Sequence, residues 1–250
     1  MLEVTLLAAI AGTFLLAGAI KGVIGLGLPS VSLGLLTAAI DLPTAMALLL
    51  VPSFVTNFWQ AIVGGNGKVI LARIWPFLLT ATVTVWLGGL ALTTVNPSVL
   101  SGLLGVLLFA YGALNLVGVR VALRPRQEFW SGPVFGAANG ILTGMTGSFV
   151  VPGVMFLQAI GLPRDLLIQA MGMLFTTSTV ALALALQSNN LLSPKLGMLS
   201  AVAVIPAIAG MFLGQMIRQH LSEAIFRRVF FTALLVLGAY IVGNAISGFK

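Results

Sequence analysis

The sequence comprises 250 residues, of which 59% are hydrophobic and only 7% are charged, and its formal net charge is +7. Soluble domains carry about 25% charged residues, so this composition, with a mean hydropathy of +1.14, excludes an ordinary soluble domain. The absence of cysteine excludes disulfides, thiolate metal sites and cysteine nucleophiles. We expect the basic residues to report orientation in a membrane and predict no nucleic-acid partner.

Apolar segments separated by short polar loops recur along the whole chain. A spanning helix needs about 20 apolar residues, and backbone groups in lipid must pair within their own segment. The sequence therefore predicts an all-α polytopic membrane protein. In chain order, we expect helical elements at residues 4–20, 28–40, 44–63, 74–93, 97–119, 132–143, 149–160, 164–187, 194–217 and 224–247.

The two halves of the chain repeat each other. Residues 40–43 (Ile-Asp-Leu-Pro) match residues 160–163 (Ile-Gly-Leu-Pro) after a shift of 120 positions. We therefore predict two transmembrane repeats, 1–124 and 125–250, each with about five helical elements. Because five is odd, the second repeat enters the membrane from the opposite side, which makes the pair an inverted repeat.

The distribution of basic residues predicts the orientation. Nine lysines and arginines fall on one side of the predicted membrane and two on the other, with Lys21 set aside as intramembrane. Such a bias marks the cytoplasmic side, and both termini are then external. The nine are Lys68, Arg73, Arg120, Arg124, Arg126, Arg164, Arg218, Arg227 and Arg228, and the two are Lys195 and Lys250.

Each repeat opens with a pair of short helices around a glycine cluster. The clusters are Gly18, Lys21, Gly22, Gly25, Gly27 and Pro29 in the first half and Gly136, Asn139, Gly140, Gly144, Gly147 and Pro152 in the second. Broken helices at matching positions of a duplicated membrane protein indicate a binding site. Backbone amides at the start of a half-helix favour anions, and Lys21 adds a positive charge. We predict an anion site near the membrane midplane, between the two hairpins.

The candidate substrate-binding residues combine these clusters with polar residues on later helices. Ser53, Thr56, Asn57 and Gln60 follow helical spacing and share one face. The candidates are Lys21, Gly22, Gly25, Gly27, Asn57, Gln60, Asn139, Thr143, Gly144, Thr146, Gly147, Ser148 and Thr177.

Structural alternatives stay open for these residues. Lys21 could snorkel to the interface, and the polar face of Ser53 to Gln60 could link helices. Glycines in membrane helices often serve close packing, which is our interpretation of Gly210 and Gly214. Asp41 begins a helix, where an N-cap explains it.

Several segments resemble the sulfite exporter TauE/SafE family, also called the 4-toluene sulfonate uptake permeases. They are residues 17–27 (Ala-Gly-Ala-Ile-Lys-Gly-Val-Ile-Gly-Leu-Gly), 48–52 (Leu-Leu-Leu-Val-Pro), 57–60, 139–147 and 151–152. The resemblance implies transport, often export, of sulfonates or sulfite across a bacterial inner membrane. Pro29 comes earlier than the family's usual proline, and Ser148 replaces a common glycine.

Composition also limits the mechanism. The chain contains no G-x-x-x-x-G-K-[ST] motif, so we expect no ATP hydrolysis, and one histidine without cysteine argues against an enzyme. We expect no cofactor and no metal. An anion leaving a negative-inside cell gains about 2.3 kcal/mol per charge per 100 mV, so export needs no coupling ion. The alternatives are a cation-coupled importer and a non-transporting membrane subunit; lipids are partners, and a homodimer is left open.

Overall fold

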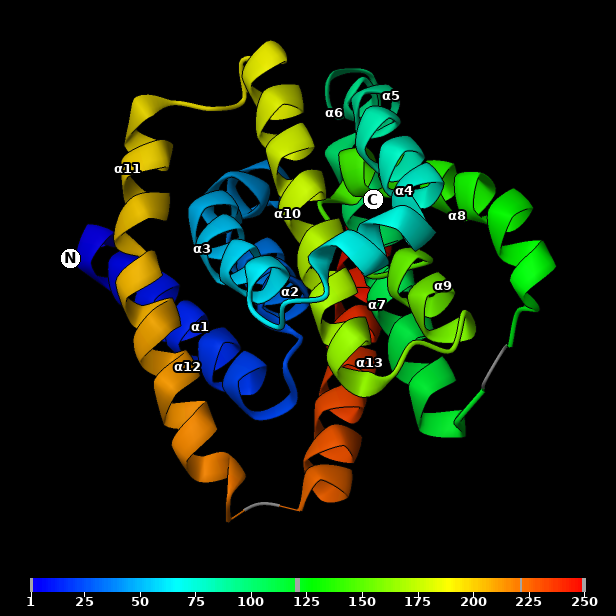
Figure 1. The fold of residues 1–250 in the computed structure, drawn as a ribbon. Coiled ribbons are helices and arrows are strands. Elements are labelled where there is room, and N and C mark those ends of the chain that lie inside the picture. The colour runs from blue at the N-terminus through cyan, green and yellow to red at the C-terminus, as the bar shows by residue number, and fades with distance from the viewer. Residues whose placement is uncertain (1, 120–121, 221, 249–250) are drawn as a thin grey trace. The chain divides into compact units, whose positions relative to one another are not determined.

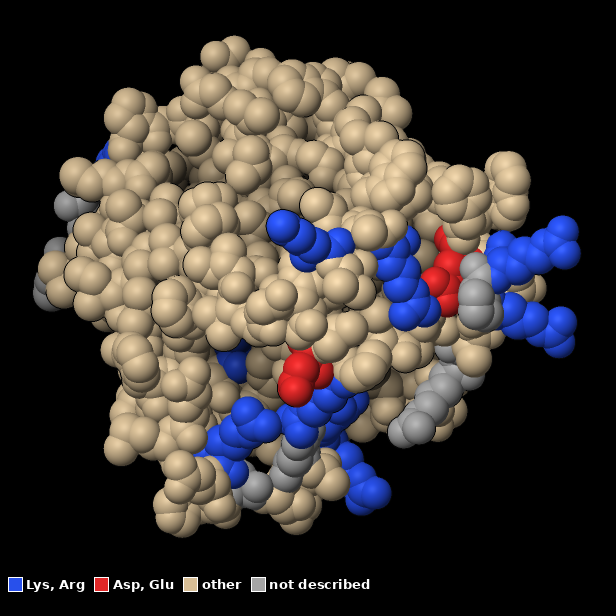
Figure 2. Space-filling view, viewed as in Figure 1, with Lys and Arg blue, Asp and Glu red and all other residues tan. Residues whose placement is uncertain are grey.

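The computed structural model describes residues 2–119, 122–220 and 222–248 (Figure 1), so Arg120 and Lys250 lie outside the described residues. Within these ranges the chain forms helices and no strands, which confirms the all-α prediction. Seven helical segments are long and apolar enough to cross a membrane. They are residues 4–24, 42–62, 67–94, 97–117, 164–188, 194–218 and 224–247. Figure 2 shows a face on which wide areas carry no charged side chain, as lipid contact requires.

The chain folds into two compact units, and each unit takes elements from both halves of the sequence. Unit 1 comprises residues 1–52, 97–118 and 193–250. Its helices are α1 (Leu2–Ile24), α2 (Leu28–Ala39), the first part of α3 (Leu42–Ile62), α7 (Pro97–Val117), α11 (Pro194–Val202), α12 (Val204–Arg218) and α13 (Glu223–Ser247). Within unit 1, α1 lies along α12 and α7 lies along α13 (Figure 1).

Unit 2 comprises residues 53–96 and 119–192. Its helices are the second part of α3, then α4 (Gly67–Val83), α5 (Val85–Gly89), α6 (Ala91–Thr94), α8 (Pro125–Thr146), α9 (Gly153–Ala159) and α10 (Arg164–Ser188). Here α8 packs against α4 and α5, and α10 packs against α4, α5, α8 and α9. Arg73 on α4 forms a bidentate ion pair with Glu128 on α8 and also donates to the Ile160 carbonyl.

Each unit pairs the first helix of one half of the sequence with a later helix of the other half. In unit 1 the first helix of the first half, α1, packs against α12 of the second half, and in unit 2 the first helix of the second half, α8, packs against α4 and α5 of the first. A duplicated chain produces this reciprocal pairing. The compact units therefore do not follow the boundary at residues 124 and 125. The two repeats and their opposite insertion stay predictions.

Small residues let the paired helices approach closely. A Cβ built on Gly22 of α1 would collide with the Met211 carbonyl oxygen of α12, and one built on Gly210 would collide with the Leu15 carbonyl oxygen. In unit 2 a Cβ on Gly144 would collide with the Val85 carbonyl oxygen. Such close backbone contact is typical of small residues in membrane helices, and it confirms the packing interpretation of Gly210.

The first helix break is narrower than predicted, and the second lies further along the chain than predicted. The first helix was expected to be short, 4–20, but α1 continues to Ile24, and the expected element 132–143 is the longer α8. Gly18 and Gly22, like Gly136, Gly140 and Gly144, therefore lie inside helices, because a packed neighbour stabilises a helix through its glycines. The breaks cover only residues 25–27 and 147–152, and α9 begins at 153 instead of 149.

Candidate functional site

The first break connects α1 to α2 in unit 1. Gly25 has φ 78° and Gly27, the N-cap of α2, has φ 109°. Both values lie in the left-handed region that glycine adopts without steric penalty. A Cβ at Gly27 would also approach the Ile20 side chain at 2.9 Å and Phe230 at 3.1 Å. Glycine is therefore required at this turn by both its dihedral angles and its surroundings.

Lys21 lies in the last turn of α1, beside this break. Its side chain is only 5% exposed. A lysine that snorkels must present its ammonium group at the surface, so the low exposure disfavours that alternative. Charged residues inside membrane-spanning segments face the protein or a wet cavity and mark functional sites. Lys21 thus places a buried basic side chain at the first break.

The second break connects α8 to α9 in unit 2. Gly147 ends α8 with φ 72°. The Thr143 hydroxyl donates to the Ser148 carbonyl at 2.9 Å, while the Thr146 hydroxyl donates to the Leu142 carbonyl at 2.6 Å and accepts from the Ser148 amide at 3.2 Å. Each hydroxyl carries a single hydrogen, and both are already donated to backbone carbonyls. In this conformation these two threonines build the turn.

Asn139 lies on α8 and faces the start of α9. Its side chain is fully buried, and its Oδ1 accepts from the Gly153 amide at 2.9 Å. Since an amide N–H requires an acceptor, this bond fixes the orientation of the carboxamide and leaves Nδ2 as a donor. Nδ2 has no hydrogen-bond partner among the described residues. Buried polar atoms are nearly always paired, so this donor is available to a bound acceptor.

The polar face of α3 also lies in unit 2 from Ser53 onward. Ser53, Thr56 and Asn57 are buried, as the shared face predicts. Asn57 donates to the Ser53 hydroxyl at 2.9 Å, and that hydroxyl lies 3.3 Å from the Thr179 hydroxyl of α10. Sequence reasoning missed Thr179 and its neighbour Ser178, whose buried hydroxyl has no partner within the described part of the chain. The run of four hydroxyl residues at 176–179 was the available signal.

Other candidates have structural contacts of their own. Gln60 donates from Nε2 to the Ile168 carbonyl at 2.7 Å, and Gln169 returns a bond to the Ala61 carbonyl at 2.9 Å. These reciprocal bonds join α3 to α10, as the helix-linking alternative describes. Thr177 donates to the Leu174 carbonyl at 3.1 Å. Among the candidates, Asn139 keeps a buried donor without a partner in the described residues, and Lys21 has a buried basic side chain.

Comparison with known families covers both breaks. The model of the family described as "Sulfite exporter TauE/SafE" matches residues 10–241. The chain belongs to the sulfite exporter TauE/SafE family. This confirms the resemblance carried by the glycine segments and, with the seven apolar segments, identifies a multi-pass membrane transporter. No curated protein and no solved structure matches this TauE/SafE family member significantly.

Proposed function

We propose that this TauE/SafE family member exports small sulfur-containing anions, sulfonates or sulfite, across the inner membrane of a bacterium. The family match to a sulfite exporter supports the substrate class. The nine-to-two distribution of basic residues supports external termini and cytoplasmic basic loops. Outward movement of an anion is favoured by a negative-inside potential by about 2.3 kcal/mol per charge per 100 mV. Export therefore requires no coupled ion.

The observation that carries the proposal is the unpartnered amide of Asn139. Sulfonate and sulfite oxygens accept hydrogen bonds, and Asn139 offers a buried donor whose orientation is fixed by the Gly153 amide. A hydrogen bond to a charged group contributes about 1.5–3 kcal/mol. Lys21, at the first break in unit 1, is proposed separately as an anion ligand, since an ammonium group carries the charge opposite to that of the substrate.

The remaining candidates of the two breaks receive supporting roles in this proposal. Gly25 and Gly27 allow the left-handed turn that follows Lys21. Gly147 and Ser148, together with Thr143, form the turn that presents the start of α9 to Asn139. These residues position the two ligands, and their substitution should lower anion affinity through the shape of the turn. Gly22 and Gly144 are assigned to helix packing.

The test is efflux of a labelled sulfonate from proteoliposomes with an imposed potential. Asn139→Asp keeps an oxygen for the Gly153 amide but exchanges the donor for a negative charge, so anion affinity should fall by about 10- to 100-fold, equivalent to 1.5–3 kcal/mol. Lys21→Ala should abolish flux, and Lys21→Arg should restore it only in part because guanidinium is larger and planar.

Matched controls keep the interpretation specific. Asn115, which donates to the Tyr111 carbonyl within α7, and the exposed Lys68 provide the same residue types away from the breaks. Asn115→Asp and Lys68→Ala should transport normally. Normal flux in folded Asn139→Asp and Lys21→Ala would reject the proposed ligands. The same vesicles with reversed potential distinguish export from cation-coupled import.

A further inference from the structure

A cavity lies in unit 1, apart from the candidate anion ligands. Its volume is about 370 Å³, and it forms where the ends of α2 and α13 meet the start of α7 and the link from α2 to α3. None of the thirteen candidate substrate-binding residues lines it. Pockets of roughly 300–1,000 Å³ hold small organic ligands, so this cavity is larger than a bare ion requires.

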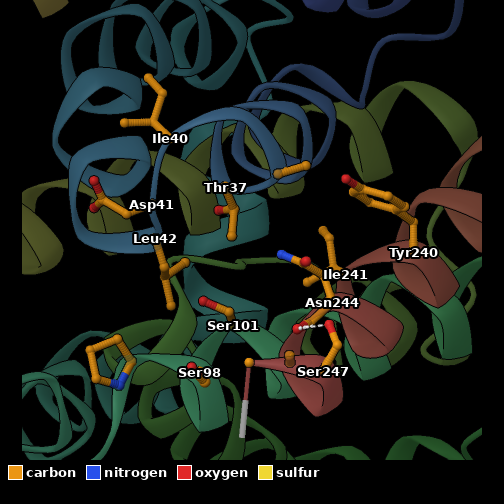
Figure 3. Close-up of a pocket in the computed structure, with 14 residues that line it drawn as sticks. Thr37, Ile40, Asp41, Leu42, Ser98, Ser101, Tyr240, Ile241, Asn244 and Ser247 are labelled. Atoms are coloured by element: carbon orange, nitrogen blue, oxygen red, sulfur yellow. Dashed lines mark hydrogen bonds between the residues drawn. The ribbon is translucent and has the colours of Figure 1, made fainter. Parts of the chain in front are cut away.

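Polar side chains from separate helices surround this space. Figure 3 shows Thr37 of α2, Ser101 of α7 and Asn244 of α13 arranged around it. The Thr37 hydroxyl is buried and has no hydrogen-bond partner in the described residues. Helical threonines commonly donate to the carbonyl four residues earlier, as Thr80 and Thr176 do here. Thr37 does not, so its hydroxyl remains available toward the cavity.

The charge at the cavity is negative. Asp41 is the one charged side chain among the described lining residues, and no lysine or arginine joins it there. Its Oδ1 caps α3 by accepting from the Thr44 amide at 2.8 Å, which confirms the expected N-cap and leaves Oδ2 for a ligand. The C-terminal ends of α2 and α13 add partial negative charge. These features disfavour a second site for the transported anion.

We propose that this cavity binds a primary ammonium group. Its N–H donors suit the Thr37 hydroxyl, which is unpartnered among the described residues, and the Asn244 carbonyl oxygen. The exposed Asp41 carboxylate supplies the opposite charge, and the Tyr240 ring also lines the cavity, where an aromatic side chain attracts a cation. A metal ion fits less well, because no cluster of three or more His, Cys, Asp or Glu residues occurs in the described ranges.

Two kinds of ligand, a free amine and a lipid headgroup, could bring a primary ammonium group to this cavity. The cavity lies at the start of the apolar segment 97–117 and at the end of the segment 224–247, and we expect the ends of spanning segments to lie near lipid headgroups. Free ethanolamine and a phosphatidylethanolamine headgroup both carry the required group. The proposal is independent of the proposed anion transport, because no residue is shared with the two ligands assigned above.

The experiment measures thermal stabilisation of the full-length protein by ethanolamine, and retention of phosphatidylethanolamine against phosphatidylcholine by native mass spectrometry. Asp41 is exposed, so solvent screens its charge and Asp41→Asn should weaken binding by about fivefold. Thr37→Val should weaken it by about 10- to 100-fold, because the buried hydroxyl accepts a hydrogen bond from a charged donor. Asp165→Asn removes the same charge at the start of α10 and should leave binding unchanged.

Each outcome decides the proposal. Saturable binding of ethanolamine identifies a free amine as a source, and selective retention of phosphatidylethanolamine identifies the lipid, provided that Asp41→Asn weakens either one. Tetramethylammonium has no N–H donor and should bind more weakly. Absence of both ligands from the folded wild-type protein, or binding insensitive to Asp41→Asn and Thr37→Val, overturns the proposal. Anion flux is not part of this readout, so failure here leaves the transport proposal standing.

Discussion

Ser200 replaces a backbone hydrogen bond that Pro52 removes from α3. Pro52 lies inside α3 and has no N–H for the carbonyl of Leu48, four residues earlier. Ser200 of α11 is 1% exposed, and its hydroxyl donates to that carbonyl at 2.8 Å while accepting from the Val51 amide at 3.0 Å. The Ser200 hydroxyl thus supplies the donor that Pro52 cannot give to the Leu48 carbonyl. Ser200→Ala should therefore destabilise the protein.

The expected loss follows from the environment of these bonds. Interhelical hydrogen bonds in membrane proteins contribute about 0.6 kcal/mol on average and at most about 1.7 kcal/mol. Ser200→Ala removes two of them and takes the replacement donor away from the Leu48 carbonyl, so we expect a loss of about 1–2 kcal/mol. At about 2–4 °C per kcal/mol, the melting temperature should fall by about 2–8 °C.

A double-mutant cycle isolates the mechanism. Pro52→Ala supplies an N–H to the Leu48 carbonyl, so Ser200→Ala should be less harmful in that background, with a coupling energy of at least about 0.5 kcal/mol. The assay is thermal unfolding of the purified protein in detergent. Ser131→Ala, at an exposed hydroxyl bonded to the Gln127 carbonyl, is the control and should change little. Equal losses from Ser200→Ala in both backgrounds would refute the reasoning.

Two further predictions concern orientation and packing. A cysteine at Ser188 should react with an impermeant thiol reagent from outside the cell and one at Gln127 should not, because basic residues mark the cytoplasmic side; labelling of both from one side would contradict the inverted repeat. Gly22→Ala should lower the melting temperature without ligand, since its Cβ would collide with the Met211 carbonyl oxygen, whereas Gly12→Ala, with open space around it, should not. Equal melting of both variants would remove Gly22 from the helix contact.

The sequence predicted those features that depend on neighbouring residues in the chain. Hydropathy depends on consecutive residues, so the expected elements 97–119, 164–187 and 224–247 agree within two residues with α7, α10 and α13. The family resemblance rested on short glycine segments and was confirmed over residues 10–241. The external termini and the inverted insertion stay predictions. The external termini and the inverted insertion are defined relative to a membrane, and the evidence for them is the sequence repeat and the distribution of basic residues.

The function of an individual glycine could not be predicted from the residues next to it in the sequence. Gly22 and Gly27 are the same residue type five positions apart, yet Gly22 packs inside α1 against α12, and Gly27 turns the chain with φ 109°. Only the neighbouring helix distinguishes them, and it comes from residues 204–218. For this reason the sequence predicted a first break that was too wide and a second break that began too early.

The availability of side-chain donors was likewise decided by tertiary contacts. Sequence marked Asn139 and Thr143 as equivalent candidates, but the fold gives the Thr143 hydrogen to the Ser148 carbonyl and leaves Asn139 Nδ2 without a partner in the described residues. A hydrogen bond depends on direction and distance between atoms that the turn brings together. Residue type and helical spacing determined which groups are polar and buried in this membrane protein, whereas the packed structure decided which of them remain available to a ligand.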